Sequence, residues 1–376
     1  MLKLSKVILL LFVFSLLGFS PLLAQHGQEE EHSTSNHASE SQSTKEFNAG
    51  EYVLEHVSDS YDWHITSWGR DHHISFPLPV ILYSKHPELH GGKKFHVFMS
   101  SKFHHQHDDY LGFRVSESEE YDGKIVELDV HGNELGRPFD ISVTKTIAEA
   151  IISVILMIVV LISIAKAAKR NTGKAPSGLQ NLLEPIIIFI RDEVAKPAIG
   201  DKKYEKFMPY LLSVFFFILL NNFVGLIPFP PFGANVTGNI AVTMVLALFT
   251  FGITTINGNK HYWKEIYNPD VPWWLKFPIP LMPIVELSGV ITKPFVLMVR
   301  LFANMMAGHM IVSVFVSLIF IFTSIMGPAA GFGISPVSVA FSVFIVLLDV
   351  LVSFIQAYVF TLLSALYFGM ATAEHH

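Results

Sequence analysis

Residues 293–309 read K-P-F-V-L-M-V-R-L-F-A-N-M-M-A-G-H, and they hold a permanent cation, Arg300, inside an apolar segment. The fold of the chain has to accommodate this charge. From Phe277 to Ala373 only four residues carry a full charge: Glu286, Lys293, Arg300 and Asp349. A guanidinium does not lose its proton in a protein, and holding it in hydrocarbon costs about 2.5–3.5 kcal/mol on insertion scales. We therefore expect Arg300 to have a function, with a structural ion pair to a buried acid as the alternative.

Helical spacing sorts the polar residues around Arg300. At about 100° per residue, Asn304 lies near the face of Arg300, and Lys293 and Glu286 fall on the same stripe. His309 points to the opposite side, about 13 Å further along the axis. This helix is predicted to present a fixed cation on one face and a titratable imidazole on another.

The run R-L-F-A-N-M-M-A-G-H at residues 300–309 resembles the signature of subunit a of the rotary F-type ATP synthase, whose shared core is R-L-F-x-N-x-x-x-G. The likeness extends to N-N-F-V-G-L-I-P at residues 221–228, N-V-T-G-N at residues 235–239 and F-I-Q-A-Y-V-F-T-L-L near the C-terminus. It covers roughly residues 145–376 and leaves out the segment before them.

The resemblance implies a proton-translocating stator subunit with two offset half-channels that load and unload a carboxylate on the c-subunit ring. Arg300 would be the partner of that carboxylate, with Gln356 orienting or shielding it. The half-channels would be lined by Asn222, Glu286, Asn304, His309, Asp349 and Gln356. The implied partners are the c-subunit ring, the b-subunit peripheral stalk, the remaining F0F1 subunits and the lipid bilayer of a bacterial inner membrane.

His309 and Asp349 are expected to form a proton relay pair. In the better-known bacterial members of the family that this chain resembles, an acid stands where His309 stands and a histidine where Asp349 stands. The two residue types are exchanged here, as in mitochondrial relatives, and a contacting pair would tolerate such an exchange. Lys293 is expected at a helix-end interface, where its stem can reach the polar boundary.

Composition excludes several classes of protein. With 51% hydrophobic and 15% charged residues and a mean hydropathy of +0.44, the chain is predicted to be an integral membrane protein. A net charge of −6 argues against nucleic acid as a partner. There is no cysteine for a disulfide or a thiol-based site, and no glycine-rich phosphate-binding loop. We expect no cofactor, and we expect nucleotide chemistry to take place on another polypeptide.

Residues 1–24 have the layout of a secretory signal peptide, with two lysines, an apolar run and L-L-A before Gln25. An uncleaved membrane anchor is the alternative. Residues 25–45 are rich in His, Ser and Glu and are expected to be a flexible linker. Residues 46–140 are predicted to form a small β-rich extracytoplasmic domain. Its strand-like runs are at residues 74–83, 94–100 and 124–130, the last followed by a turn at H-G-N-E.

Histidine is concentrated in this N-terminal region. Fourteen of the 18 histidines lie between His26 and His131, including the run H-H-Q-H-D-D at residues 104–109. Imidazole together with carboxylate suits zinc or copper, whereas a solvated, pH-responsive surface is the alternative. Because the Cys/His spacing of a structural zinc site is missing, we favour the surface and assign no metal.

Residues 144–376 are expected to be an all-α polytopic membrane domain with about five membrane helices. Spans are predicted at residues 144–166, 210–229, 240–256, 284–325 and 336–368, with an amphipathic surface helix at residues 179–194. The last two spans would be about 63 and 50 Å long, against a hydrocarbon core of about 30 Å. They must break, as at Pro294, or tilt, and the resemblance implies a long, steeply tilted hairpin.

The basic residues orient this domain. Nine Lys and Arg residues lie between Lys166 and Lys206. The positive-inside rule puts this loop in the cytoplasm, which places the N-terminal domain outside and the C-terminus in the cytoplasm.

Two other functions are weighed against the stator subunit. A secondary ion transporter with a midplane site should show internal repeats with paired broken helices, and the sequence shows none. An intramembrane metal-dependent enzyme needs an H-E-x-x-H run or a Ser/His pair on adjacent spans; the run is absent and His309 has no obvious nucleophile to serve.

Overall fold

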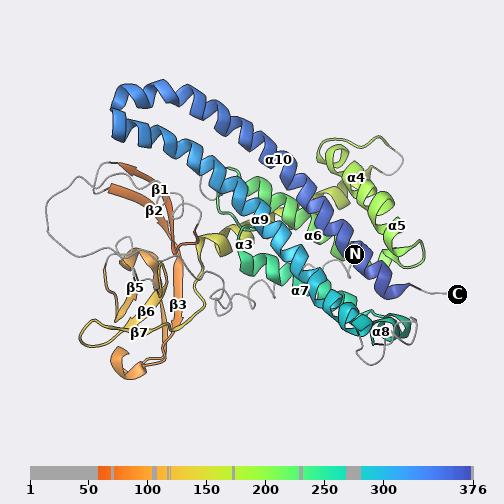
Figure 1. Cartoon of the computed structure of the whole chain (residues 1–376), viewed down its shortest axis with the longest axis horizontal. Coiled ribbons are helices and arrows are strands. Elements are labelled where there is room, and N and C mark those ends of the chain that lie inside the picture. Colours follow the sequence, from red (N-terminus) through yellow and green to blue (C-terminus); the bar gives the residue numbers. More distant parts are fainter. Residues whose placement is uncertain are drawn as a thin grey trace. The chain divides into compact units, whose positions relative to one another are not determined.

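The fold is described from a computed structural model (Figure 1), which describes residues 58–68, 72–103, 108–116, 118, 120–171, 174–227, 232–267 and 281–373. The predicted signal peptide, the linker and the histidines of residues 104–107 lie outside the described residues. The described chain divides into two compact units. The first contains Ile147–Met305 and the chain from Val350 onward, and the second contains the residues before Ile147 together with Met306–Asp349.

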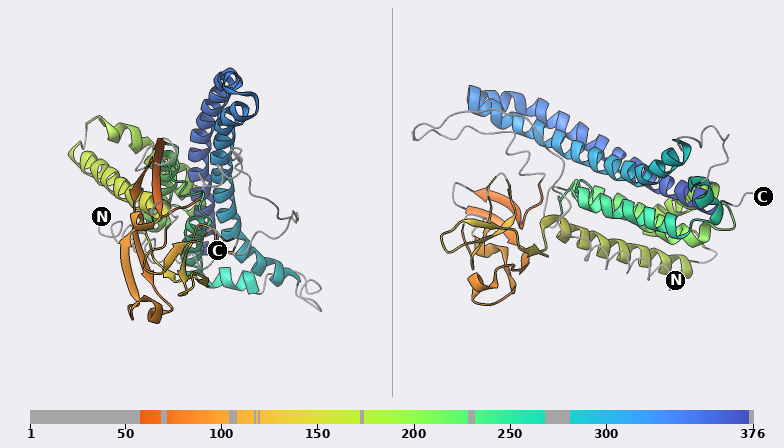
Figure 2. Two further views of the ribbon diagram at one scale, coloured as in Figure 1. Left: turned by 90° about the vertical axis from the view of Figure 1, so that its left-hand side faces the viewer. Right: turned by 60° about the horizontal axis from the view of Figure 1, so that its bottom comes forward.

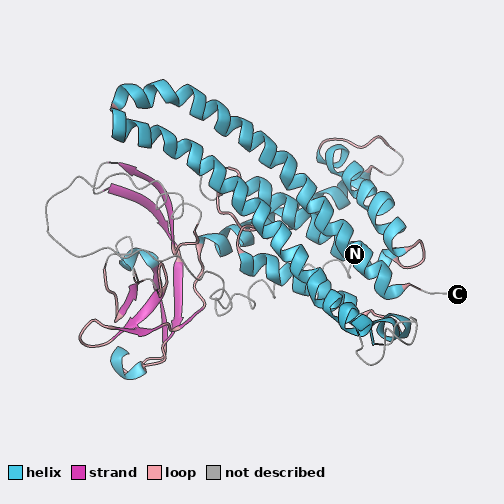
Figure 3. Cartoon of the chain, viewed as in Figure 1, coloured by secondary structure: helices cyan, strands magenta, loops and turns pink. Residues whose placement is uncertain are grey.

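The N-terminal part of the second unit is built from short antiparallel strands (Figure 3). They are β1 (Asp62–Trp68), β2 (His72–Pro77), β3 (Pro79–Tyr83), β4 (Phe95–Met99), β5 (Phe113–Val115), β6 (Ile125–Leu128), β7 (Glu134–Gly136) and β8 (Phe139–Asp140). Pairing gives three small sheets, β1-β2, β4-β3-β8 and β5-β6-β7. The β-rich region is therefore confirmed, except that the expected strand at residues 74–83 is divided at Leu78 into the ends of β2 and β3.

The predicted turn after residues 124–130 joins β6 to β7. The Gly132 amide donates to the Asp129 carbonyl at 2.9 Å, and the Asp129 amide donates to the Asn133 carbonyl at 2.9 Å. Strand alternation then builds the core, because Val80 and Leu82 of β3 both point inward and are fully buried. They pack in one cluster with Phe103, Phe113, Val115, Ile125 and Tyr61.

Two hydrogen bonds fix the first turn of the next helix to this β-rich region. The Lys145 amide donates to the Ser60 carbonyl at 2.9 Å, and the Thr146 amide donates to Asp59 Oδ1 at 3.0 Å. Both bonds satisfy amides that lack partners within a helix at its N-terminal end. The strands and the start of the helix therefore form one body.

The rest of the chain is helical. The helices are α3 (Lys145–Arg170), α4 (Leu179–Phe189), α5 (Lys196–Ile199), α6 (Tyr204–Gly225), α7 (Ile240–Ile256), α8 (Lys260–Tyr267), α9 (Leu281–Met326) and α10 (Pro328–Thr372). Among the described residues, α3, α6, α9 and α10 are long and apolar enough to cross a membrane. The α7–α8 pair, bent by 105°, adds a fifth span if it is counted as one.

In the α9–α10 hairpin the break at Pro294, one of the two alternatives, is not found, and the boundary between the helices differs from the prediction. Helix α9 continues through Pro294 for 46 residues, because a proline removes only one intrahelical hydrogen bond that a long helix can lose. The expected break at residues 326–335 is reduced to Gly327, whose φ of 85° lies in a region that glycine adopts without strain, and α10 begins at Pro328. As predicted, both helices are longer than the hydrocarbon core is thick, and α9 is not shortened by a break.

Polar contacts tie the helices of the first unit together. Helices α6 and α7 run side by side (Figure 2), and the Tyr210 hydroxyl lies 2.8 Å from Thr250 Oγ1. Thr250 Oγ1 is also 3.2 Å from the Ser364 hydroxyl of α10. The rings of Phe207 and Phe368 stack at 4.9 Å. These contacts hold the C-terminal half of α10 against α6 and α7.

Replacing Tyr61 with phenylalanine is predicted to destabilise the β-rich region. The Tyr61 hydroxyl donates to Asp140 Oδ2 at 2.5 Å, and removing a donor from a buried carboxylate costs about 1–3 kcal/mol. Burial and then Asp140 raise the pKa of Tyr61 well above its usual value. The folded region should thus lose stability as pH rises above about 10, the usual tyrosine pKa, and Tyr61→Phe should lose that dependence.

The measurement is limited proteolysis of the full chain in detergent, with cleavage followed between residues 58 and 144 across a pH series. Tyr83→Phe is the matched control, because the Tyr83 ring is exposed and its hydroxyl makes no hydrogen bond among the described residues. Equal cleavage of the two variants at every pH would contradict the prediction.

Candidate functional site

Arg300 lies on the exposed side of α9. The side chains of Leu297 and Leu301 on the same helix are buried, whereas those of Phe295 and Val299 are exposed. Within the part of the chain that the structure describes, Arg300 makes no hydrogen bond or ion pair. The alternative role of Arg300, a structural ion pair with a buried acid, therefore has no candidate acid among the described residues.

The amide residues of the predicted site lie in different surroundings. Asn304 is exposed like Arg300, which agrees with their predicted common face. Gln356 of α10 is buried, and no hydrogen bond joins it to Arg300 among the residues described. Asn222 of α6 is buried, and its side-chain carbonyl accepts a hydrogen bond from the Thr237 hydroxyl.

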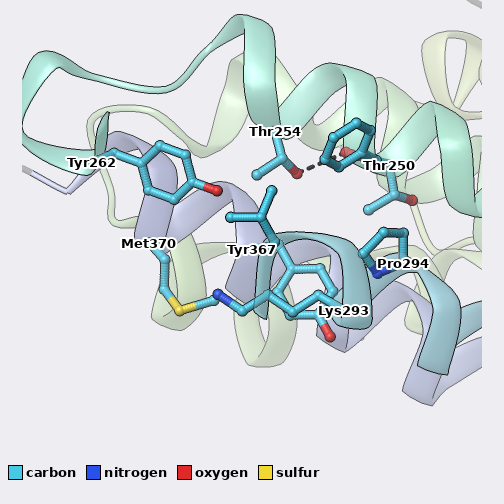
Figure 4. Close-up of a pocket in the computed structure, with 9 residues that line it drawn as sticks. Thr250, Thr254, Tyr262, Lys293, Pro294, Tyr367 and Met370 are labelled. Carbon is cyan, nitrogen blue, oxygen red and sulfur yellow. Dashed lines mark hydrogen bonds between the residues drawn. The ribbon is translucent and has the colours of Figure 1, made fainter. Parts of the chain in front are cut away.

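A pocket of about 320 Å³ lies between α7, α8, α9 and α10 (Figure 4). Its lining residues are Thr250, Phe251, Thr254, Tyr262, Val290, Lys293, Pro294, Tyr367 and Met370. The Lys293 ammonium lies 5.8 Å from the centre of the Tyr367 ring, a cation–π distance. The expectation that Lys293 lies at a helix end is wrong. Lys293 lies in the interior of α9, because α9 continues past Pro294.

Glu286, which shares its helix stripe with Lys293, is half-buried on α9. It lies within electrostatic range of Tyr262, a residue that lines the same pocket. The predicted stripe of Glu286, Lys293 and Arg300 is therefore present on one continuous helix, and its N-terminal part borders a cavity.

The second unit brings Asp349 of α10 to the helix turn that carries His309. A Cβ atom added at Gly308 would lie 2.6 Å from Asp349 Oδ1 and 2.9 Å from Oδ2, closer than such atoms can approach. The carboxylate thus packs directly on the backbone next to His309, and only glycine leaves room for it. Asp349 therefore lies against the residue that precedes His309, 41 residues away in sequence, and the pairing of the His309 and Asp349 side chains stays a prediction.

Three serine residues of α9 and α10 were not predicted from the sequence to belong to the site. The Ser313 hydroxyl donates to the His309 carbonyl at 3.0 Å, and the Ser317 hydroxyl donates to the Ser313 carbonyl at 2.8 Å. On α10 the Ser338 hydroxyl donates to the Phe315 carbonyl. The spacing of His309, Ser313 and Ser317 by four residues is the signal that could have found this polar stripe.

Glu149 of α3 was also missed as a site residue. Its side chain is fully buried, and its Oε2 accepts the Ala234 amide hydrogen. A signal existed in the sequence, because Glu149 is the single acid in the apolar run from Ile147 to Ala165.

A metal site needs several ligating side chains close together. No group of three or more His, Asp or Glu residues that could hold a metal ion is present among the described residues.

The fold and the site together define a class of protein: a membrane-embedded helical protein with a cation, an imidazole and carboxylates on one long apolar hairpin. Comparison with known families gives a match of residues 150–369 to the ATP synthase A chain. Residues 52–143 match a domain of unknown function (DUF8433). The chain belongs to the ATP synthase A chain family, which supports a role as a proton-translocating stator subunit of the membrane sector.

Curated relatives agree with the family match. The chain is 44% identical to ATP synthase subunit a of Chloroherpeton thalassium over 243 residues, which cover 63% of this chain and 68% of the relative. It is 44% identical to ATP synthase subunit a 2 of Chlorobaculum tepidum over 242 residues, covering 63% and 65%. With ATP synthase subunit a of Myxococcus xanthus it shares 41% identity over 243 residues, covering 63% and 75%.

Replacing Gly308 with alanine is predicted to reduce proton conduction by the reconstituted membrane sector. The added methyl group would overlap the Asp349 carboxylate, and over-packing of this kind costs about 1–3 kcal/mol or moves the side chain. Proton uptake into vesicles under a fixed membrane potential measures the effect.

Gly289→Ala is the matched control, because a Cβ atom at this position of α9 meets nothing within 4 Å. Conduction should be reduced in Gly308→Ala and unchanged in Gly289→Ala. Equal conduction by both variants would show that the close approach of Asp349 to Gly308 does not matter for proton flow.

Proposed function

We propose that this chain couples proton flow to rotation by loading and unloading a carboxylate on each subunit of a c ring. Membership of the ATP synthase A chain family supports the general role. The observation that carries the finer mechanism is Arg300, a cation exposed on an apolar helix surface without an ion pair among the described residues.

The proposal rests on the cost of charge in lipid. A c-ring carboxylate can cross the hydrocarbon only in its protonated form, because the charged form is too costly there. Opposite charges about 4 Å apart attract by about 4 kcal/mol at an effective dielectric constant of about 20. This attraction is comparable to the cost of about 2.5–3.5 kcal/mol of holding Arg300 in the membrane. Arg300 can therefore draw the proton off an arriving carboxyl group.

Arg300 also separates the two proton paths. A fixed cation repels protons, so it opposes their direct flow between one half-channel and the other. Protons that cross must then travel on the c ring, which makes their flow depend on rotation. A neutral residue at this position would remove both the attraction and the barrier.

The outer half-channel is proposed to run along Asn222, Asn304, His309, Asp349 and Gln356. Support comes from the packing of Asp349 against Gly308, beside His309, and from the buried position of Asn222. An imidazole titrates near neutral pH, so a histidine next to a carboxylate suits stepwise proton transfer. Glu286, which lies within electrostatic range of the pocket residue Tyr262, is proposed for the half-channel that opens to the cytoplasm.

The remaining partners and the orientation are proposals as well. We place the chain in a bacterial inner membrane, against the c ring and the b-subunit stalk, with its C-terminus in the cytoplasm. The nine basic residues between Lys166 and Lys206 support this orientation. The β-rich region would then lie outside the cytoplasm.

Arg300→Ala is predicted to abolish ATP-driven proton pumping in inverted vesicles while ATP hydrolysis by the soluble sector survives. The reason is the loss of both the attraction and the barrier described above. Pumping is measured by quenching of a pH-sensitive dye, and hydrolysis by phosphate release. Arg191→Ala is the control, because Arg191 forms a surface ion pair with Asp192 at 2.8 Å. Normal pumping by Arg300→Ala would refute the proposal.

His309 and Asp349 are predicted to be energetically coupled. Residues that act in one relay show coupling energies of about 0.5–3 kcal/mol, so the double replacement should cost less than the sum of the single ones. Proton conduction is compared in His309→Ala, Asp349→Ala and the double variant, each checked for assembly of the complex. Strictly additive losses would count against a shared relay.

A further inference from the structure

Glu149 is a buried carboxylate that the mechanism above does not use. It lies one turn into α3, on the face that also buries Ser153 and Met157. No part of its side chain is exposed to solvent. An ionisable residue kept in an apolar membrane helix is costly and by default functional.

Glu149 is connected to the proposed outer half-channel through the segment that precedes α7. Its Oε2 accepts the Ala234 amide hydrogen, and the Val236 amide donates to the Ala234 carbonyl at 3.0 Å. The next residue, Thr237, donates its hydroxyl hydrogen to Asn222 of α6. Ala234, Val236, Thr237 and Asn222 are all buried. A continuous polar line thus runs from α3 to α6 inside the first unit.

The same segment reaches α9. The Asn235 side-chain amide donates to the Met305 carbonyl at 3.3 Å, on the residue after Asn304. Its carbonyl oxygen accepts the Gly238 amide at 2.8 Å, which fixes the orientation of the side chain. Residues 234–238 therefore join Glu149 to Asn222 of the proposed outer half-channel and to the Met305 carbonyl, on the residue that follows Asn304.

Buried polar atoms on this line favour a proton path over a simple brace. Among the described residues, Ser153 Oγ and Asn222 Nδ2 are buried without a hydrogen-bond partner. Buried polar atoms in proteins are nearly always satisfied, by protein groups or by ordered water. Polar atoms of this kind at both ends of the line are therefore suited to a file of water molecules, along which protons can move.

We propose that Glu149 is a proton-binding residue of the outer half-channel, which takes up a proton and passes it along residues 234–238 towards Asn222 and Asn304. This inference rests on the proposed function. The proton binds to one carboxyl oxygen and leaves from the same group, so no other reactant is needed. The Ala234 amide donates to Oε2 and sets the orientation of the carboxyl group.

The test uses the whole complex with Glu149→Gln, Glu149→Asp and Ser213→Ala, reconstituted into vesicles. Glutamine can still accept the Ala234 hydrogen bond but cannot carry a proton, so Glu149→Gln should lower proton conduction at least about tenfold. Glu149→Asp keeps a carboxyl group and should retain part of the conduction. Ser213 is a buried polar control, because its hydroxyl donates to the Pro209 carbonyl of its own helix at 2.8 Å, and its variant should conduct normally.

Each other result overturns the inference. Normal conduction by Glu149→Gln would make Glu149 a structural brace. Failure of Glu149→Gln to assemble with the c ring would do the same, because proton binding has no part in assembly. Equal loss in the Gln and Asp variants would also count against it. Arg300→Ala, measured in parallel for ATP-driven pumping, separates the two proposals: if it abolishes pumping while Glu149→Gln pumps and conducts normally, the inference about Glu149 fails and the proposed function stands.

Discussion

The cost of a charge in hydrocarbon governs this structure. Arg300 cannot release its proton, and each membrane helix around it is built from residues that offer it little solvation. Such a charge persists only where a partner offsets the free-energy cost of burying it in hydrocarbon, or where a function requires it. Because Arg300 is exposed and lacks an ion pair among the described residues, its partner is expected outside this chain. A c-ring carboxylate has the right charge for that position.

The length of the α9–α10 hairpin follows from the same constraint. Two helices of 46 and 45 residues present a long surface, which suits the passing rotor that we propose. Large apolar side chains such as Phe295, Leu347 and Leu351 are exposed along it, which suits contact with lipid or another apolar surface. Asp349 packs against Gly308 between the two helices, and the Ser338 hydroxyl donates to the Phe315 carbonyl across them.

Much of this was predictable from the sequence. The apolar runs predicted the membrane helices, and α7 has the bounds expected for it, because hydropathy and helix period depend on local residues only. The strands and the turn between β6 and β7 followed from alternation and turn residues. The stripe of Glu286, Lys293 and Arg300 also followed from helix geometry alone. The boundary at residues 326–335 was wrong, because proline and glycine signal a break that a long packed helix can override, and of the two alternatives at Pro294 the break is not found.

The sequence by itself determined which charges lie in the membrane domain, and on which face of their helix each one lies. Tertiary structure alone decided that Asp349 packs against Gly308, that Lys293 lies over Tyr367, and that Glu149 reaches Ala234. The two members of each pair are between 41 and 85 residues apart in the chain and come from separate helices or loops, so no local pattern encodes these contacts. Their contacts depend on how the helices pack, and packing is a property of side-chain shapes across the whole domain.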